Sequence, residues 1–215
     1  MKDPRRDFTV LLGKKIGNLT RFPFFYSAWQ TVFYRQKVRP FLADPHTRVA
    51  HRILDVGCGP GTNAGLFIDR DYVGVDCDAR YVETAKQKYG DRFVLAHAEK
   101  YSFSQHGKFD HVLMNSLLHH LDEKEVHEVL ANVRSAMGPG SSVHILDLVL
   151  PLERGLPRFL SKIDRGGHPR LISHWRALFA QHFKESVFKP YRLSLAGLSF
   201  YEMVYFKGTI QNPSE

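Results

Sequence analysis

Short apolar runs alternate with helical stretches between residues 53 and 148, and this alternation constrains the fold more than any other feature. The runs expected to form strands are 53–56, 72–76, 93–96, 109–114 and 143–148. The stretches expected to form helices are 62–69, 79–89 and 122–137. Strands that are regularly separated by helices predict an α/β fold with a doubly wound, mostly parallel sheet that is covered on both faces.

Capping residues mark the ends of the expected helices. Gly90 closes the second helix, since glycine readily takes the left-handed conformation after a last turn. Asp122 and Glu125 have the spacing of a capping box at the start of the third. Gly138 and Pro139 are then expected to stop that helix.

The C-terminal part of the chain departs from this rhythm. A helix is expected over 171–183, followed by β-like runs at 186–193 and 200–206. The link 194–198 is too short for a crossover helix, so these two strands should pair antiparallel. The segment 150–183 is expected to pass over the active site, with its polar stretch at 164–170 either contacting an acidic group of a substrate or forming a solvated loop.

Charge divides the chain into two unequal parts. The net charge of +8 belongs to residues 1–52, which hold eleven Lys and Arg against three acidic residues, whereas the rest of the chain is balanced. With 215 residues, one full core and a small appendage are expected. We therefore expect a basic, aromatic N-terminal helical segment over 1–52, a catalytic domain over 53–208 and a tail over 209–215.

Cysteine and apolar content indicate the compartment. The two cysteines, Cys58 and Cys77, are too few to staple a secreted scaffold, and no clustered Cys/His pattern suggests a metal site. No apolar run reaches the roughly 18 residues that span a bilayer. These observations predict a cytoplasmic protein without a metal.

A glycine-rich segment, Asp55-Val56-Gly57-Cys58-Gly59-Pro60-Gly61-Thr62-Asn63, joins the first strand to the first helix. Glycines allow a backbone to turn tightly and to approach a ligand closely, although a purely structural turn would also use them. Asp76 ends the next strand 19 residues after Gly57, which is the spacing of an acidic residue that binds ribose hydroxyls. The combination predicts a ligand of the adenosine type.

The glycine spacing narrows the choice of ligand. Thr62 stands where a dinucleotide-binding G-x-G-x-x-G would have its third glycine, and no G-K-[ST] of a P-loop follows. The segment resembles motif I of the class I S-adenosylmethionine-dependent methyltransferases, and the resemblance runs from about Ile53 to Phe206. The sequences V-G-V-D, A-E and L-L-H-H-L-D-E that follow are similar to the small-molecule branch that includes ubiquinone and menaquinone methyltransferases.

This resemblance implies a Rossmann-like, mostly parallel seven-stranded sheet with a reversed last strand, plus an N-terminal helical lid. It implies S-adenosylmethionine as cofactor, S-adenosylhomocysteine as product, and a small apolar or aromatic metabolite as substrate. Two alternatives stay open. One is a methyltransferase-like protein that binds the cofactor without transferring methyl, as a binding subunit or a cyclase. The other is an RNA methyltransferase, which the neutral catalytic domain disfavours.

The resemblance also implies the residues of a cofactor site. The loop would pass under the methionine part of the cofactor, with Asp55 holding its amino group, Asp76 the ribose and Cys77 the adenine face. Ala98 and Glu99 would form the adenine loop, where His97 departs from the family pattern. The cofactor-binding residues expected in full are Asp55, Gly57, Cys58, Gly59, Gly61, Asn63, Asp76, Cys77, Ala98, Glu99, Asn115 and Ser116.

Histidines after the fourth strand are the candidates for acceptor chemistry. His119 and His120 follow that strand, where a substrate pocket would open, and histidine has a suitable pKa for a base. We favour His120 as the catalytic residue, with His119 second, against the alternative that both only shape the loop. His111 and His144 sit within strand patterns and are expected to be packing or surface residues.

Aromatic side chains gather in the N-terminal segment, with seven in residues 22–34. They would line a lid, with Tyr26 and Tyr34 as substrate-contacting candidates, or they would simply dock a helix onto the domain. Lys14, Lys15 and Arg21 lie among apolar residues and could contact an anionic membrane or a carrier protein with a tethered substrate.

Overall fold

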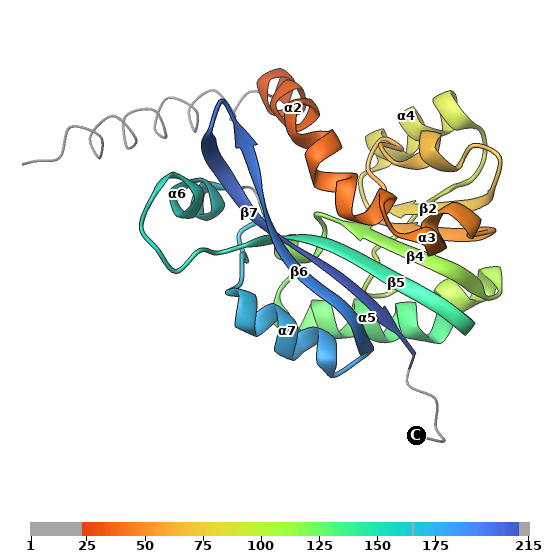
Figure 1. The fold of residues 1–215 in the computed structure, drawn as a ribbon. Coiled ribbons are helices and arrows are strands. Elements are labelled where there is room, and N and C mark those ends of the chain that lie inside the picture. Colours follow the sequence, from red (N-terminus) through yellow and green to blue (C-terminus); the bar gives the residue numbers. More distant parts are fainter. Residues whose placement is uncertain (1–22, 165, 211–215) are drawn as a thin grey trace, which may run out of the picture.

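The computed structural model describes residues 23–164 and 166–210, and for residues 23–31 it describes the backbone path alone. Seven strands form one sheet in the order β3-β2-β1-β4-β5-β7-β6 (Figure 1). The strands are β1 (Arg52–Val56), β2 (Asp71–Asp76), β3 (Phe93–Leu95), β4 (Phe109–Asn115), β5 (Met137–Val149), β6 (Lys184–Leu195) and β7 (Leu198–Thr209).

The first five strands pair in parallel, as their apolar runs predict. Strand β7 lies between β5 and β6 and runs antiparallel to both, so it is the reversed strand of the sheet. The turn between β6 and β7 consists of Ala196 and Gly197, which both have positive φ, at 48° and 78°. Two consecutive residues with positive φ are typical of a tight hairpin turn, which confirms the expected antiparallel pair.

Helices cover both faces of the sheet (Figure 1). One face carries α5 (Glu123–Ala136) and α7 (Ile172–Ala180), and the other carries α2 (Pro23–Leu42), the 3₁₀ helix η1 (Ala64–Phe67) and α4 (Ala79–Tyr89). Neighbouring strand residues point to opposite faces, so that Leu54 packs with the α5 layer and Ile53 with the α2 layer. The remaining helices are α3 (Pro45–Val49), α6 (Leu156–Ile163), η2 (Phe103–His106) and η3 (Leu118–His120).

Local sequence signals explain the helix ends. Asp122 accepts a hydrogen bond from the Glu125 amide at 2.8 Å, and the Glu125 carboxylate accepts one from the Asp122 amide at 2.9 Å, which completes the expected capping box of α5. Gly90 ends α4 with a φ of 83°. Among the described residues, no helix combines the length and apolar character needed to cross a bilayer.

The structure departs from the expected local structure at three places. The stretch 62–69 forms only the short 3₁₀ helix η1, because the glycine loop continues through residue 63. Gly138 and Pro139 do end α5, but they lie inside β5, where they extend that strand. Helix α6 was not expected within the segment 150–183, and it packs beside the β6–β7 hairpin through Leu156 and Leu160.

A pair of histidines lies inside the core under α2. His111 and His144 are fully buried and stack with ring centroids 4.2 Å apart, and Phe41 of α2 packs against both rings. The His144 nitrogens hydrogen-bond to Tyr205 and Ser142, each at 2.9 Å. Both nitrogens of His111 are buried without a hydrogen-bond partner among the described residues. Both histidines therefore pack in the core.

Burial sets the protonation of this pair. It lowers the pKa of His111 to about 4 and holds the pKa of His144 well below 6.5. Asp110 and Asp44 oppose this shift at His111, whereas Lys207 and His46 reinforce it. A group that is neutral in the native state but charged in the unfolded state near pH 5 makes unfolding proton-linked.

Replacement of His111 by phenylalanine should make the protein less sensitive to acid. Stability should be present above the unfolded pKa of 6.5 and be lost as the pH falls toward the native pKa of about 4. We expect the free energy of unfolding to fall by roughly 2 kcal/mol less in His111→Phe than in the wild type between about pH 7.5 and about pH 5. Urea unfolding at both pH values measures this, with exposed His51→Gln as the control, and equal losses in wild type and His111→Phe would contradict it.

Candidate functional site

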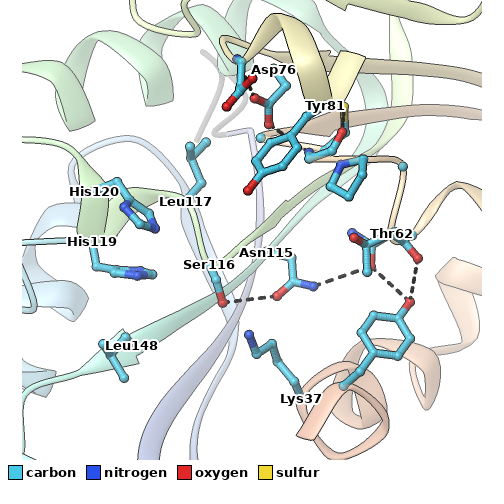
Figure 2. Close-up of a pocket in the computed structure, with 18 of the residues that line it drawn as sticks. Lys37, Thr62, Asp76, Tyr81, Asn115, Ser116, Leu117, His119, His120 and Leu148 are labelled. Carbon is cyan, nitrogen blue, oxygen red and sulfur yellow. Dashed lines mark hydrogen bonds between the residues drawn. The ribbon is translucent and has the colours of Figure 1, made fainter. Parts of the chain in front are cut away.

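A cavity of about 940 Å³ opens where strands β1, β2 and β4 end (Figure 2). The carboxyl ends of adjacent parallel strands are the usual position of a ligand site in such sheets. One half of the cavity is lined by the glycine loop, Asp76, Cys77 and the start of α4. The other half is lined by α2, by the histidines of η3 and by the hairpin of β6 and β7.

The glycine loop needs its glycines for two different reasons. Gly57, Gly59 and Gly61 all have positive φ, between 55° and 77°, which side chains rarely tolerate. A Cβ atom on Gly57 would also lie 2.9 Å from Leu117, whereas one on Gly59 would meet no atom within 4 Å. Gly57 therefore allows close packing, and Gly59 leaves open space beside the cavity. Cys58 belongs to this loop and lines the cavity, and the residue is buried.

Asp76 ties the loop to the end of β2. Its carboxylate accepts hydrogen bonds from the amide of Gly59 at 2.8 Å and from the amide of Asp78 at 2.9 Å. The side chain also lines the cavity, as does that of Cys77. A carboxylate held by two backbone amides at the end of a strand is well placed to accept further hydrogen bonds from ribose hydroxyls.

Asp55 lies behind the cavity and does not line it, contrary to the direct contact that the resemblance implies. Its carboxylate is fully buried and accepts hydrogen bonds from Tyr72 at 2.7 Å and from Asn63 at 3.2 Å. Burial raises the pKa of Asp55 to about 6. Asn63 does line the cavity, and its amide oxygen accepts hydrogen bonds from Tyr34 at 3.2 Å and Asn115 at 3.4 Å. Asp55 is thus joined to the cavity wall through Asn63, and its other carboxylate oxygen is buried without a hydrogen-bond partner among the described residues.

Ala98 and Glu99 also lie outside the cavity lining. Asn132 of α5 donates hydrogen bonds to the backbone carbonyls of both residues, at 3.2 and 3.0 Å. The Glu99 carboxylate lies 3.5 Å from His97 and 3.7 Å from Lys100. The loop after β3 is therefore anchored toward α5, and the described structure does not bring these two residues to the site.

The cavity brings together the other expected cofactor residues. Gly57, Cys58, Gly59, Gly61, Asn63, Asp76, Cys77, Asn115 and Ser116 all line it. Ser116 has a φ of 58°, which is unusual for a residue with a side chain and marks a sharp turn after β4. Of the two tyrosines expected near the substrate, Tyr34 lines the cavity, whereas the side chain of Tyr26 lies outside the described residues.

His119 is held between two carboxylates. Its Nδ1 lies 2.6 Å from the fully buried Asp147, and its Nε2 lies 3.2 Å from Asp164. Asp147 also accepts hydrogen bonds from the amides of Leu118 and Leu148, at 2.8 and 2.7 Å. Burial lowers the pKa of His119, but the two carboxylates outweigh it and bring the pKa to about 9. His119 is therefore an imidazolium at neutral pH.

His120 faces the same cavity in a different state. Burial, together with the neighbouring positive charge of His119, lowers its pKa from the usual 6.5. The two rings lie with their centroids 4.3 Å apart, and Figure 2 shows both pointing into the cavity from η3. Donor atoms of His119, His120 and Asp164 lie within 4.8 Å of one another, but a metal ion could bind them only by replacing the hydrogen bond between His119 and Asp164.

Sequence reasoning missed the roles of Asp147 and Lys37. A charged residue within the apolar run of β5 is the signal that could have identified Asp147, because buried strands rarely carry an unpaired carboxylate. Lys37 of α2 lines the cavity and is only 8% exposed. No local pattern distinguishes Lys37 from the other basic residues around it. The sequence distinguishes Asp164 only as the first residue of the polar stretch 164–170.

Comparisons with known proteins agree with this arrangement. Residues 53–140 match a family model described as a methyltransferase domain. An O-methyltransferase of Aspergillus nomiae is 29% identical over 138 residues, which cover 60% of this chain and 55% of that protein. The chain thus spans about half the length of this curated relative.

Two solved structures share the fold. A methyltransferase from Archaeoglobus fulgidus that depends on S-adenosylmethionine superposes with a TM-score of 0.63 at 16% identity, over 86% of this chain and 99% of its own. Human N-acetylserotonin methyltransferase in complex with S-adenosylmethionine also gives a TM-score of 0.63, at 18% identity, over 86% of this chain and 55% of its own.

The glycine loop and Asp76 lie within the residues that match the methyltransferase domain, and the sheet with its reversed β7 has the fold of these S-adenosylmethionine-dependent methyltransferases. The cofactor of the two solved methyltransferases is S-adenosylmethionine, and the site of this chain fits it: Gly59 leaves open the space that a Cβ would fill, and Asp76 presents its carboxylate to the same cavity. Membership of the ubiquinone and menaquinone branch remains a prediction.

Replacement of Asp76 by alanine should weaken binding of S-adenosylhomocysteine at least tenfold. The change removes a charged acceptor and also frees the Gly59 amide, and hydrogen bonds to charged groups contribute about 1.5–3 kcal/mol each. Calorimetric titration measures the affinity. Asp71→Ala, at the exposed start of the same strand, is the matched control, and an unchanged affinity in Asp76→Ala would refute the ribose assignment.

The charge state of His119 can be measured directly. NMR titration of labelled histidines should show His119 titrating at about 9 in the wild type and at a lower pH in Asp164→Asn, which removes one of the two carboxylates. Asp69→Asn, on the surface, should leave the His119 titration in place. A wild-type His119 that titrates near 6.5 would show that the carboxylates do not control it.

Proposed function

We propose that this protein transfers the methyl group of S-adenosylmethionine to a hydroxyl oxygen of a small, largely apolar metabolite. The observation that carries the proposal is a single cavity that joins the glycine loop and Asp76 to a neutral histidine, His120. The name of the Aspergillus nomiae relative supports oxygen as the acceptor atom.

The walls of the acceptor half favour a small apolar or aromatic molecule. They consist mostly of apolar and aromatic side chains from α2, β5 and the β6–β7 hairpin, namely Phe33, Leu148, Leu193, Tyr201 and Met203. A volume of about 940 Å³ lies at the upper end of the range of small-molecule sites, about 300–1,000 Å³. Such a cavity can hold a nucleoside cofactor together with a compact acceptor, which favours a metabolite over a polymer.

His120 is the group best suited to accept the hydroxyl proton. The bound cofactor supplies an activated methyl group, so the chain must position the acceptor, exclude water and remove a proton. A base must be unprotonated at the working pH, and the lowered pKa of His120 meets this condition. His119 does not meet it, because its carboxylate neighbours keep it protonated.

His119 then serves as a positioning residue for His120. Its ring is fixed at both nitrogens by Asp147 and Asp164, and it lies beside the His120 ring. Once His120 has taken up a proton, Asp164, Asp147 and Asp76 are the nearby charges that favour its cationic form. The cluster can therefore receive a proton without leaving an isolated charge in the cavity.

Partners and location remain proposals that rest on sequence. The excess positive charge lies in residues 1–52. Residues 1–22 of this segment lie outside the described part of the chain. This charge supports contact with an anionic membrane surface or with a carrier protein that presents the acceptor. The two cysteines are both free, which is compatible with a reducing cytoplasm.

Replacement of His120 by alanine should lower kcat for methylation of a phenolic acceptor by about 10²–10⁴-fold, because it removes the base, while binding of S-adenosylhomocysteine should stay within about threefold. Added imidazole should restore part of the activity. Wild-type activity should decline only at a pH below the ordinary histidine value of about 6.5, because the pKa of His120 is lowered.

The pH profile separates a base from a structural role. If His120 only shapes the loop, its loss should leave the acidic limb of the profile in place and imidazole should have no effect. A normal kcat in His120→Ala would overturn its assignment as the base.

A further inference from the structure

The β6–β7 hairpin projects beyond the rest of the sheet. Strand β7 pairs with β5 only from Glu202 onward, so that, in the sheet as described, residues 193–201 form a projection of two strands. Figure 1 shows this end of the hairpin between α6 and α2. The hairpin tip, residues 195–198, has the sequence Leu-Ala-Gly-Leu and is exposed along its whole length.

The composition of the hairpin tip is unusual for an exposed turn. Leu195 and Leu198 are 44% and 51% exposed, and exposed runs of four apolar or small residues normally have a function. Ala196 and Gly197 both have positive φ, and asparagine followed by glycine is the preferred sequence of such a turn. Asparagine would therefore suit the backbone at position 196 better than alanine does. The tip is more apolar than its turn geometry requires.

Packing on both sides holds the hairpin tip in an extended position. Gln36 of α2 donates a hydrogen bond to the Ser194 carbonyl at 2.8 Å and accepts one from the Ser194 amide at 3.0 Å. Helix α6 supports the hairpin through Leu156 and Leu160, which pack in one cluster with Leu193. An isolated hairpin of two strands is only marginally stable in water, so these contacts keep the projection in place.

Exposed cations lie beside the hairpin tip on the α2 side. Val32, Arg35 and Arg39 form one exposed stripe along α2, at spacings of three and four residues. The stripe borders Gln36, which bonds to the hairpin. The sequences of α2 and α6 contain no acidic residue. Residues 1–22, which lead into α2, add six Lys and Arg against two acidic residues. Positive charge therefore accompanies the exposed leucines.

We propose that the hairpin tip docks this protein on an anionic lipid bilayer, with Leu195 and Leu198 entering the boundary between headgroups and acyl chains. Arg35 and Arg39 then lie against the lipid headgroups. Surfaces that lie on membranes combine apolar side chains with cations in this way. A specific protein partner would need a complementary surface of about 800 Å² on each side, whereas a bilayer adapts to a small projection. The inference builds on the membrane contact proposed above from charge, and it does not depend on methyl transfer.

Co-sedimentation of the chain of 215 residues with lipid vesicles tests this surface. We expect binding to phosphatidylcholine vesicles that contain about 30% phosphatidylserine, and weaker binding without phosphatidylserine or at about 0.5 M salt, which screens the charges. The double variant Leu195→Ser/Leu198→Ser should lower the partition coefficient by about tenfold or more, because it removes the apolar contact. Arg35→Gln/Arg39→Gln should lower it by about tenfold or more on the anionic vesicles alone.

Two double variants serve as matched controls. Leu66→Ser/Leu95→Ser replaces leucines that are 41% and 54% exposed, on η1 and at the end of β3, which is the opposite edge of the sheet from β6. Lys124→Gln/Arg134→Gln replaces two exposed cations of α5, which covers the other face of the sheet from α2. Both controls should bind vesicles as the wild type does. Circular dichroism verifies that each variant is folded.

Three results would each overturn the docking surface. The first is no binding of the wild type to anionic vesicles, as expected if the tip docks a carrier protein or is covered by residues 1–22. The second is undiminished binding of Leu195→Ser/Leu198→Ser, as expected if positive charge alone is sufficient. The third is an equal loss of binding in the matched controls.

An assay of methyl transfer without vesicles separates this inference from the proposed function. A protein that binds anionic vesicles through the hairpin tip but methylates no hydroxylated acceptor would count against the proposed function and leave the docking surface standing. A protein that methylates such an acceptor but does not bind anionic vesicles would support the proposed function and overturn the docking surface.

Discussion

Parallel pairing of β1 with both β2 and β4 is the constraint on which the rest of the structure depends. It brings the carboxyl ends of three strands to one edge of the sheet, so that the glycine loop, Asp76 and Asn115 meet although they are far apart in sequence. Parallel strands also require helical crossovers, which cover both faces and exclude water from the strand residues. The cavity is therefore a consequence of the topology.

The acceptor half depends on a second set of interactions. Helix α2 docks on the sheet through Phe41, which packs against the buried histidines of β4 and β5, and it is joined to β6 through Gln36 and Lys37. The hairpin and α6 complete this side with apolar contacts. The same helix thus closes the site and supplies one of its charged groups. Docking of α2 therefore completes the acceptor half of the cavity.

Electrostatics within the site separates two adjacent histidines that look equivalent in sequence. His119 lies between Asp147 and Asp164 and is held as a cation, whereas no carboxylate of the described residues is hydrogen-bonded to His120, and burial and the neighbouring His119 lower its pKa. Opposite shifts of two neighbouring titratable groups are the usual way in which a site assigns acid and base roles. Asp147 is buried and also accepts hydrogen bonds from two backbone amides, so its carboxylate is held in place beside His119.

Much of the fold could be predicted from local patterns. The apolar runs located all seven strands, Asp122 and Glu125 located the start of α5, and Gly90 located the end of α4. Errors occurred where tertiary contacts override local preference. Gly138 and Pro139 continue β5 because the pairing of this strand with β4 already begins at Met137, and residues 62–63 stay in the glycine loop because Asn63 bonds to Asp55.

The sequence by itself determined the class of fold and most of the cofactor half, because these depend on periodicity, glycine spacing and residues at strand ends. Only the tertiary structure decided that Asp55 bonds to Asn63 behind the cavity wall, that the Ala98 and Glu99 carbonyls bond to α5, and that the pKa values of His119 and His120 shift in opposite directions. It also placed Lys37 in the acceptor half. Burial and pairing of charges depend on residues far apart in the sequence, such as His119 and Asp164, which are 45 positions apart, and no local pattern encodes such pairs.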